Sequence, residues 1–230
     1  MRIGGTVRRA TGPWTPAVHA LLGHLAERVP HIPEVLGFDD RGREMLSYLP
    51  GRVIDLDTEV LAPAQIVALV GWTRDFHDAV AEFTHPGPWR YFPIDNTTMI
   101  GHNDIAPYNA CFDGDRLTGI FDWDLAGPSN PLMELAFIAW NCVPLWSAEV
   151  GSATTARRLE LIASTYGTHT PLEILRAVPA RIQTMLTGIP AAAAAGDAGM
   201  ANLITAGEPE RSRASLAGLR ERIPSIEGAL

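Results

Sequence analysis

Two short segments in the middle of the chain carry the side chains best suited to chemistry. In Ile100–Asn109, a loop places Asp104 and Asn109 five residues apart. In Gly119–Asp124, Asp122 follows an apolar stretch. A carboxylate and an amide supply the hard oxygen ligands that Mg²⁺ prefers, and a second carboxylate can accept a proton from a hydroxyl group. Together these residue types match what phosphoryl transfer requires.

A predicted β-hairpin brings the two segments together. Residues 110–112 and 117–121 have the apolar character of strands, and the Asp-Gly-Asp sequence at 113–115 is typical of a turn. Folding the second strand back onto the first would place Asp122 beside Asn109.

The surrounding pattern predicts a two-lobed α+β fold. Residues 1–50 contain a hairpin around Gly4-Gly5, one amphipathic helix, and two strands at 34–38 and 44–49. Pro50-Gly51 breaks the chain. Residues 51–230 are mainly helical, and the predicted helices cover 63–83, 131–145, 154–166 and several segments after 171. We therefore expect a small N-terminal lobe of 1–50 and a larger helical lobe of 51–230.

The motif His102-x-Asp104-x4-Asn109, followed by Asp122, resembles the catalytic loop and metal-binding aspartate of protein-kinase-like folds. The sequence Phe-Asp-Trp-Asp at 121–124 is similar to the aminoglycoside phosphotransferase and choline kinase branch. Within that branch the chain resembles bacterial phosphotransferase-family and trifolitoxin-immunity-like members. The similarity extends from residue 6 to about residue 146, which is well over half of the chain.

The resemblance implies a role for each matching residue. Asp104 would be the catalytic base, and Asn109 and Asp122 would hold Mg²⁺. ATP or GTP would be the phosphoryl donor. The hinge between lobes would pair with the nucleobase through its backbone, and strand side chains would hold the phosphates. The residues concerned are Ser47, Tyr48 and Leu49 at the hinge, and Arg8 or Arg9 at the phosphates.

Three features depart from the family pattern. All 18 basic side chains are arginine, so no lysine can clamp the phosphates, and an arginine must replace it. The helix glutamate that pairs with this lysine should lie near Val18 or His19, and neither is acidic. The hairpin that carries the Gly-rich lid is absent from the short N-terminal lobe.

These departures predict weak ATP binding. Losing two charge-assisted hydrogen bonds from a lid, at roughly 1.5–3 kcal/mol each, weakens affinity more than about a hundredfold. We expect a dissociation constant in the high micromolar to millimolar range and a strong dependence on Mg²⁺ and salt. Calorimetry on the purified protein tests this expectation, and low-micromolar binding would contradict it.

Three functions remain open at this level. The first is an ATP- and Mg²⁺-dependent kinase that acts on a hydroxyl group of a small molecule or modified peptide. The second is a weak or inactive relative that works by binding, for example as a toxin immunity protein. The third is a metal-dependent phosphohydrolase, although the chain lacks paired histidine ligands. We interpret His102 and Glu134 as structural, and Asp124 as either an aid to the metal or substrate or a turn cap.

The amino-acid composition limits the classes of partner and the cellular compartment that we expect for this protein. The formal net charge of -8 is the opposite of the balance expected of a nucleic-acid-binding protein. Neither a signal peptide nor an apolar run long enough to span a membrane is evident, which favours the cytoplasm. Cys111 and Cys142 have no disulfide or metal-binding spacing. The oligomeric state cannot be inferred from these features.

Overall fold

A computed structural model describes residues 1–56 and 58–230. The chain divides into two compact units, Met1–Glu134 and Leu135–Leu230. Every strand of the described residues belongs to the first unit, and the second is helical. The predicted mixture of strands and helices is therefore confirmed, whereas the lobe boundary at residue 50 stays a prediction.

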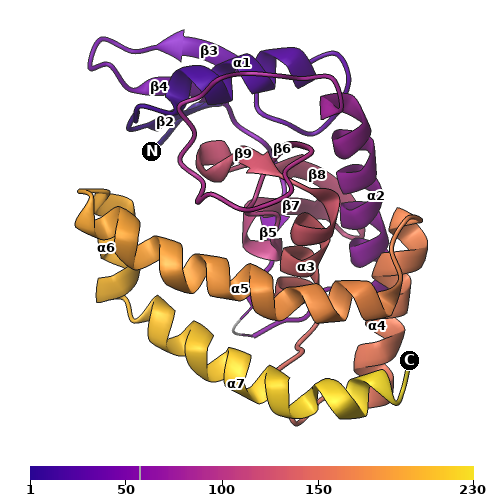
Figure 1. The fold of residues 1–230 in the computed structure, drawn as a ribbon. Coiled ribbons are helices and arrows are strands. Elements are labelled where there is room, and N and C mark those ends of the chain that lie inside the picture. The colour runs from indigo at the N-terminus through magenta and orange to yellow at the C-terminus, as the bar shows by residue number, and fades with distance from the viewer. Residues whose placement is uncertain (57) are drawn as a thin grey trace. The chain divides into compact units, whose positions relative to one another are not determined.

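An antiparallel sheet of four strands forms within the first fifty residues (Figure 1). Its strand order is β1-β2-β4-β3, and the predicted turn at Gly4, where φ is 58°, joins β1 to β2. The register places Arg9 opposite Glu44 across the β2–β4 pair. The strands are β1 (Arg2–Ile3), β2 (Thr6–Arg9), β3 (Val35–Phe38) and β4 (Glu44–Ser47).

Two helices of the first unit bury apolar faces. The predicted amphipathic helix is present as α1 (Thr15–Leu25), and its apolar side chains at 18, 21, 22 and 25 are all buried. Helix α2 (Pro63–Val80) begins at Pro63 and ends three residues before the predicted end. Trp72 and Phe76 of α2 contact the ring of Trp123, with centroids 6.3 and 5.4 Å away. This aromatic cluster anchors the segment that carries Asp122 and Asp124.

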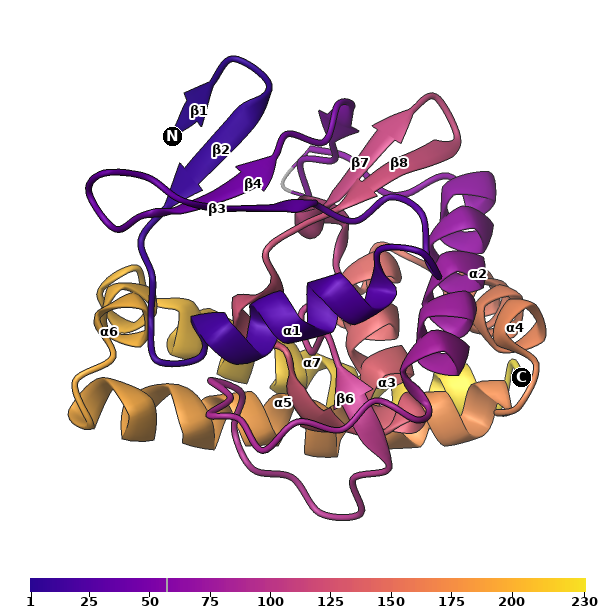
Figure 2. The ribbon, with the colours of Figure 1, turned by 90° about the horizontal axis from the view of Figure 1, so that it is seen from above.

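Short strands hold the two segments that the sequence singled out. The predicted hairpin is present as β7 (Ala110–Asp113) and β8 (Arg116–Ile120), and β5 (Arg52–Val53) pairs with β7. Strand β6 (Met99–Gly101) pairs with β9 (Gly127–Ser129). Figure 2 shows the β7–β8 hairpin projecting beside α2. The loop after β6 and the turn after β8 carry the candidate site residues.

The second unit consists of helices that pack on one another. Helix α3 (Pro131–Cys142) runs into it from the first unit and ends before Pro144, which explains why it stops short of the predicted Leu145. Arg222 on α7 donates hydrogen bonds to the carbonyl groups of Pro144 and Leu145. The other helices are α4 (Ser152–Tyr166), α5 (Pro171–Ala194), α6 (Ala198–Thr205) and α7 (Glu208–Glu227). Within the described part of the chain, no helix has the length and apolar character needed to cross a membrane.

Candidate active site

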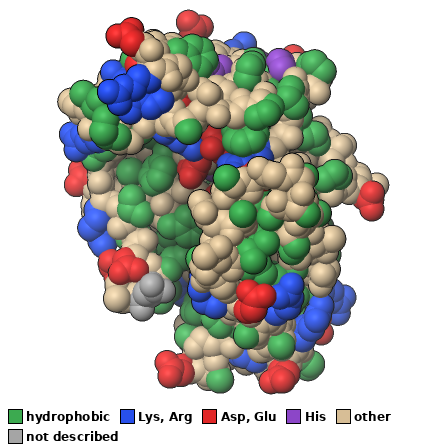
Figure 3. All heavy atoms as spheres, turned by 90° about the vertical axis from the view of Figure 1, so that its left-hand side faces the viewer, with side chains coloured by type: hydrophobic (Ala, Val, Ile, Leu, Met, Phe, Trp, Pro, Cys, Tyr) green, Lys and Arg blue, Asp and Glu red, His purple; other side chains and the backbone are tan. Residues whose placement is uncertain are grey.

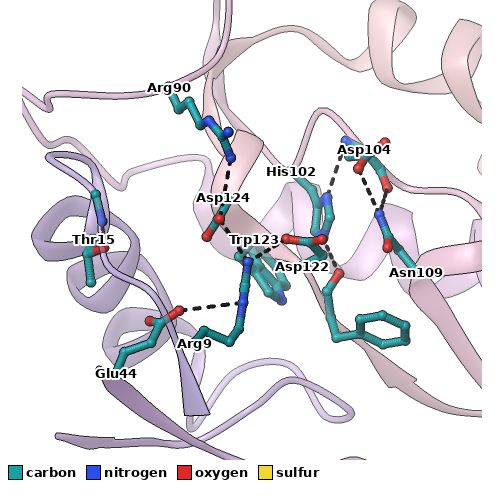
Figure 4. A network of polar contacts seen from close by, with 12 residues as sticks. Arg9, Thr15, Glu44, Arg90, His102, Asp104, Asn109, Asp122, Trp123 and Asp124 are labelled. Carbon is teal, nitrogen blue, oxygen red and sulfur yellow. Dashed lines mark hydrogen bonds and ion pairs between the residues drawn. The ribbon is translucent and has the colours of Figure 1, made fainter. Parts of the chain in front are cut away.

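Two hydrogen bonds orient the carboxylate of Asp104 in the loop after β6, and a third holds its backbone. The Tyr108 hydroxyl donates to Asp104 Oδ1 at 2.9 Å, and Asn109 Nδ2 donates to Asp104 Oδ2 at 2.8 Å. The backbone N–H of Asp104 donates to His102 Nδ1 at 3.2 Å. The contact from Tyr108 was not predicted, because a tyrosine four residues after an aspartate carries no recognisable signal. Asp104 is thus held in a fixed direction (Figure 4).

The side-chain amide of Asn109 has a defined orientation. Its Nδ2 lies 2.8 Å from the Asp104 carboxylate and 3.0 Å from the Asp104 carbonyl oxygen. Both partners are acceptors, so the NH₂ group must face them. This leaves the carbonyl oxygen Oδ1 of Asn109 to face other partners. An amide oxygen presented in this way is a suitable ligand for a hard cation.

The side chain of Glu134 anchors the loop that follows β6, as we expected from the sequence. It is 2 % exposed, and its two carboxylate oxygens accept hydrogen bonds from the backbone N–H groups of His102 and Asn103 at 3.0 and 2.7 Å. A Cβ atom at Gly101 would lie 2.9 Å from Glu134 Cδ, so only glycine leaves room for this carboxylate. The anchor and the glycine together fix where the loop begins.

Replacing Glu134 with glutamine should destabilise the protein strongly. Glutamine offers one acceptor oxygen in place of two, and its NH₂ group would face a buried N–H donor. We expect the free energy of unfolding to fall by about 2–4 kcal/mol. Urea denaturation measures the loss, and Glu160→Gln, at an exposed position of α4, is the matched control. Equal stability of the two variants would contradict the anchoring role.

His102 is a buried, neutral structural residue, in agreement with the sequence interpretation. Burial is the largest influence and lowers the pKa of its imidazole below the ordinary value. Because Nδ1 accepts the Asp104 N–H, the proton sits on Nε2, which donates to the Phe121 carbonyl oxygen at 3.1 Å. The ring therefore links the Asp104 loop to the residue before Asp122.

Asp122 lies beside Asn109, as the predicted hairpin requires. The backbone N–H of Phe121 donates to the carbonyl oxygen of Asn109 at 3.0 Å. Asp122 has φ 61° and ψ 63°, a left-handed conformation that is uncommon outside glycine but that aspartate adopts more readily than most residues. The next residue, Trp123, is 1 % exposed and donates from Nε1 to the Ile120 carbonyl oxygen. With Trp123 buried, the aspartates on either side of it turn outward.

Arg9 bridges the two aspartates. One of its terminal nitrogens lies 2.8 Å from Asp122 Oδ1 and 2.8 Å from Asp124 Oδ2, and its Nε lies 3.7 Å from Glu44 Oε1 (Figure 4). Burial disfavours the charged guanidinium, but the three carboxylates outweigh burial and raise the pKa of Arg9. Burial also raises the pKa of Asp124, although Arg9 and Arg90 oppose that shift.

The structure does not bring Arg8 to this cluster. Side chains alternate along a strand, so Arg8 leaves the opposite face of β2 from Arg9. It donates to the Thr6 hydroxyl, and its Nε lies 3.8 Å from the Asp39 carboxylate. Of the two candidate arginines, Arg9 alone contacts Asp122.

A buried glutamate supports Arg9 from a position that the sequence interpretation missed. The expected acidic residue on α1 is absent, but Glu44 on β4 is 3 % exposed and lies opposite Arg9. His19 of α1 occupies the expected helix position, and its Nε2 lies 2.9 Å from Glu44 Oε2. In this chain the acidic partner of the arginine therefore lies on strand β4, and not on helix α1. The pairing of Glu44 with Arg9 depends on the β2–β4 register, which could not be predicted from the sequence.

The predicted hinge residues line a cavity of about 420 Å³, and Asp122 also belongs to its lining. Ser47, Tyr48 and Leu49 form one side, and Cys111 and Phe121 contribute to the rest, together with Arg9. The Tyr48 N–H donates to the Gly5 carbonyl oxygen at 2.9 Å, which ties the hinge to the N-terminal hairpin. On the face drawn in Figure 3, hydrophobic side chains line a hollow, with acidic and basic side chains beside it. A mainly apolar cavity with charges at one end suits a ligand with a flat ring and an anionic tail.

The donor set fits Mg²⁺ only if the ligand itself adds oxygen atoms. Within the described residues, no group of three or more His, Cys, Asp or Glu side chains could hold a metal ion. Asp122 and the amide oxygen of Asn109 are two suitable donors. Mg²⁺ is commonly held by one or two carboxylates together with substrate phosphates and water. The residues present fit that pattern rather than a cage made by protein alone.

Comparison with known proteins gives concordant matches. A family model described as the phosphotransferase enzyme family matches residues 88–172. The trifolitoxin immunity protein of Rhizobium leguminosarum bv. trifolii is 34 % identical over 184 residues, covering 72 % of this chain and 69 % of that protein.

Solved structures agree on the fold. An amicoumacin kinase in complex with AMP-PNP and Ca²⁺ superposes with a TM-score of 0.61 and 13 % identity, covering 95 % of this chain and 80 % of that one. Aminoglycoside 2'-phosphotransferase-IIIa in complex with GDP superposes with a TM-score of 0.58 and 16 % identity, covering 96 % and 87 %. The predicted α+β fold of the protein-kinase-like type is confirmed.

Proposed function

The chain belongs to the phosphotransferase enzyme family, and we propose that it is a kinase that uses ATP or GTP with Mg²⁺ to phosphorylate a hydroxyl group. The acceptor would be a small molecule or a modified peptide. Kinase-type neighbours solved with AMP-PNP, Ca²⁺ or GDP support the use of a nucleotide and a divalent cation.

One observation carries the proposal: Asn109 joins the two parts of the chemistry. Its amide nitrogen holds the carboxylate of Asp104, and its backbone carbonyl oxygen holds the segment that ends in Asp122. The proposed proton acceptor and the two proposed cation ligands therefore lie on adjacent segments that Asn109 links. An Asp-rich turn without catalytic function would not require this linkage.

Asp104 would act on the acceptor. Its carboxylate accepts the proton of the attacking hydroxyl group while the oxygen forms a bond to the γ-phosphorus, and the bond from that phosphorus to the bridging oxygen breaks, so the nucleoside diphosphate leaves. Tyr108 and Asn109 aim the carboxylate through their hydrogen bonds. Mg²⁺, held by Asn109 and Asp122, would supply charge neutralisation of the phosphates.

The nucleotide would occupy the cavity between the hinge and Asp122. The backbone of Ser47, Tyr48 and Leu49 would pair with the nucleobase, whose ring lies against the apolar lining. Arg9 lines the same cavity at the end where phosphates would lie, and it can donate several N–H groups to them. Because the side chain of Arg8 lies on the other face of β2, we assign the binding of the phosphates to Arg9.

A thermal-shift screen with ATP and GTP, each with and without Mg²⁺, tests the proposal directly. A shift that requires both nucleotide and Mg²⁺ supports it. Acceptors are then supplied with γ-labelled nucleotide, beginning with aminoglycosides and amicoumacin, because proteins of similar fold carry the names of these compounds. Hydroxyl-bearing peptides complete the panel. Absence of any nucleotide shift in a folded protein would contradict the proposal.

A second candidate function is protection against a peptide toxin by binding it. The 34 % identity to a trifolitoxin immunity protein favours this candidate. The two candidates differ in their need for Asp104. If cells that express Asp104→Asn keep full protection against such a peptide, binding is sufficient, whereas loss of protection by a folded variant points to phosphorylation.

A further inference from the structure

Arg9 contacts three carboxylates, which is more than a side chain that only binds phosphate would require. A single terminal nitrogen reaches both Asp122 and Asp124 at 2.8 Å, and the same guanidinium faces Glu44 at 3.7 Å (Figure 4). The Arg9 side chain is 25 % exposed and that of Asp124 is 18 % exposed, whereas the Asp122 side chain is 46 % exposed. In such partly buried surroundings an ion pair is screened less than at a free surface. The guanidinium therefore occupies and partly neutralises the Asp122 carboxylate that a divalent cation would need, and Arg90 lies 3.4 Å from the carboxylate of Asp124.

A cation approaching Asp122 would meet this positive charge. Asp122 Oδ1 already accepts a hydrogen bond from Arg9. A divalent ion at the same carboxylate would be repelled by the guanidinium a few ångströms away. The other proposed donor from the protein, Asn109, is neutral and adds no charge to offset that repulsion, and Asp124 is itself paired with Arg9. Phosphate groups can, because they attract the guanidinium and also supply ligands to the ion.

We propose that Arg9 is a built-in counter-ion of Asp122 and Asp124, which a polyphosphate must draw away before a divalent cation binds. Metal binding then depends on nucleotide, and the two ligands bind cooperatively through one side chain. The part of this inference that concerns nucleotide rests on the proposed function. The part that concerns competition between Arg9 and a cation rests on the contacts alone.

Glu44 allows the guanidinium to change partners without leaving the site. It faces Nε, whereas the two aspartates are held by a terminal nitrogen of the same guanidinium. Glu44 is itself fixed by the 2.9 Å contact with His19. The arm of Arg9 therefore stays in place while its terminal nitrogens turn from carboxylate to phosphate. No large movement of the backbone is needed.

The decisive experiment measures Mn²⁺ binding without nucleotide, by the electron paramagnetic resonance signal of free Mn²⁺. We expect no binding by the wild type below about 1 mM, and at least about tenfold tighter binding by Arg9→Met. Arg9→Lys keeps a positive charge and should resemble the wild type. Arg8→Met is the matched control, since it removes the same charge from the same strand, at a residue that faces Asp39 instead.

Equal Mn²⁺ affinity of Arg9→Met, Arg8→Met and the wild type would overturn the proposal. Arg9→Gln provides a second variant should Arg9→Met fail to fold. If neither folds, the wild type decides, because Mn²⁺ binding tighter than about 1 mM without nucleotide is incompatible with a neutralised site. A parallel titration with AMP-PNP tests the proposed function separately. If AMP-PNP binds to none of the proteins, the kinase proposal fails while the Mn²⁺ comparison still stands.

Discussion

Asp122→Asn is expected to abolish the Mg²⁺-dependent part of nucleotide binding while leaving the fold intact. The substitution removes the charge of a carboxylate that follows the strand bonded to Asn109 and that lines the cavity. Asparagine adopts the left-handed conformation at φ 61° at least as readily as aspartate, so the backbone should not be strained. Thermal shift with ATP, recorded with and without Mg²⁺, measures the effect.

The control for this variant lies in the same hairpin. Asp113→Asn also removes a carboxylate, but Asp113 is exposed and paired with Arg116. It should retain the full Mg²⁺-dependent shift. If Asp122→Asn keeps the shift as well, the cation is held by other groups and the proposed role of Asp122 is wrong.

Local sequence patterns were sufficient to predict most individual elements. The hairpin at Gly4-Gly5 and the hairpin at 113–115 both follow from turn residues between apolar runs, and both are present. The apolar spacing in 15–25 likewise predicted a helix with the observed buried face. In each case the determining residues are close in the chain, which is why the pattern could be recognised.

The contacts within the site were harder to predict, because they join distant parts of the chain. Arg9 and Asp122 are 113 residues apart in sequence, and nothing local distinguishes Arg9 from Arg8. The choice between them depends on which face of β2 turns toward β8. Glu44 was missed for the same reason, since its importance depends on the β2–β4 register. A strand shifted by one residue would have exchanged the roles of the two arginines.

Asp104→Asn is expected to lower the rate of phosphoryl transfer by about two to four orders of magnitude, the range for a positioned general base. Nucleotide binding should be unchanged, because the proposed cation ligands are Asn109 and Asp122. The asparagine side chain keeps the shape of the original and one acceptor oxygen, so the loop should keep its conformation. Single-turnover kinetics with the acceptor found in the panel would measure the rate.

Tyr108→Phe separates proton transfer from orientation. This variant keeps the Asp104 carboxylate but removes the hydroxyl that donates to its Oδ1 at 2.9 Å. If Asp104 is the base, the loss of this aiming bond should reduce the rate by much less than Asp104→Asn does, since the Asn109 bond to Oδ2 remains. Equal losses in both variants would indicate that Asp104 acts by binding the acceptor in one orientation. An unchanged rate in Asp104→Asn would require a different residue to accept the proton.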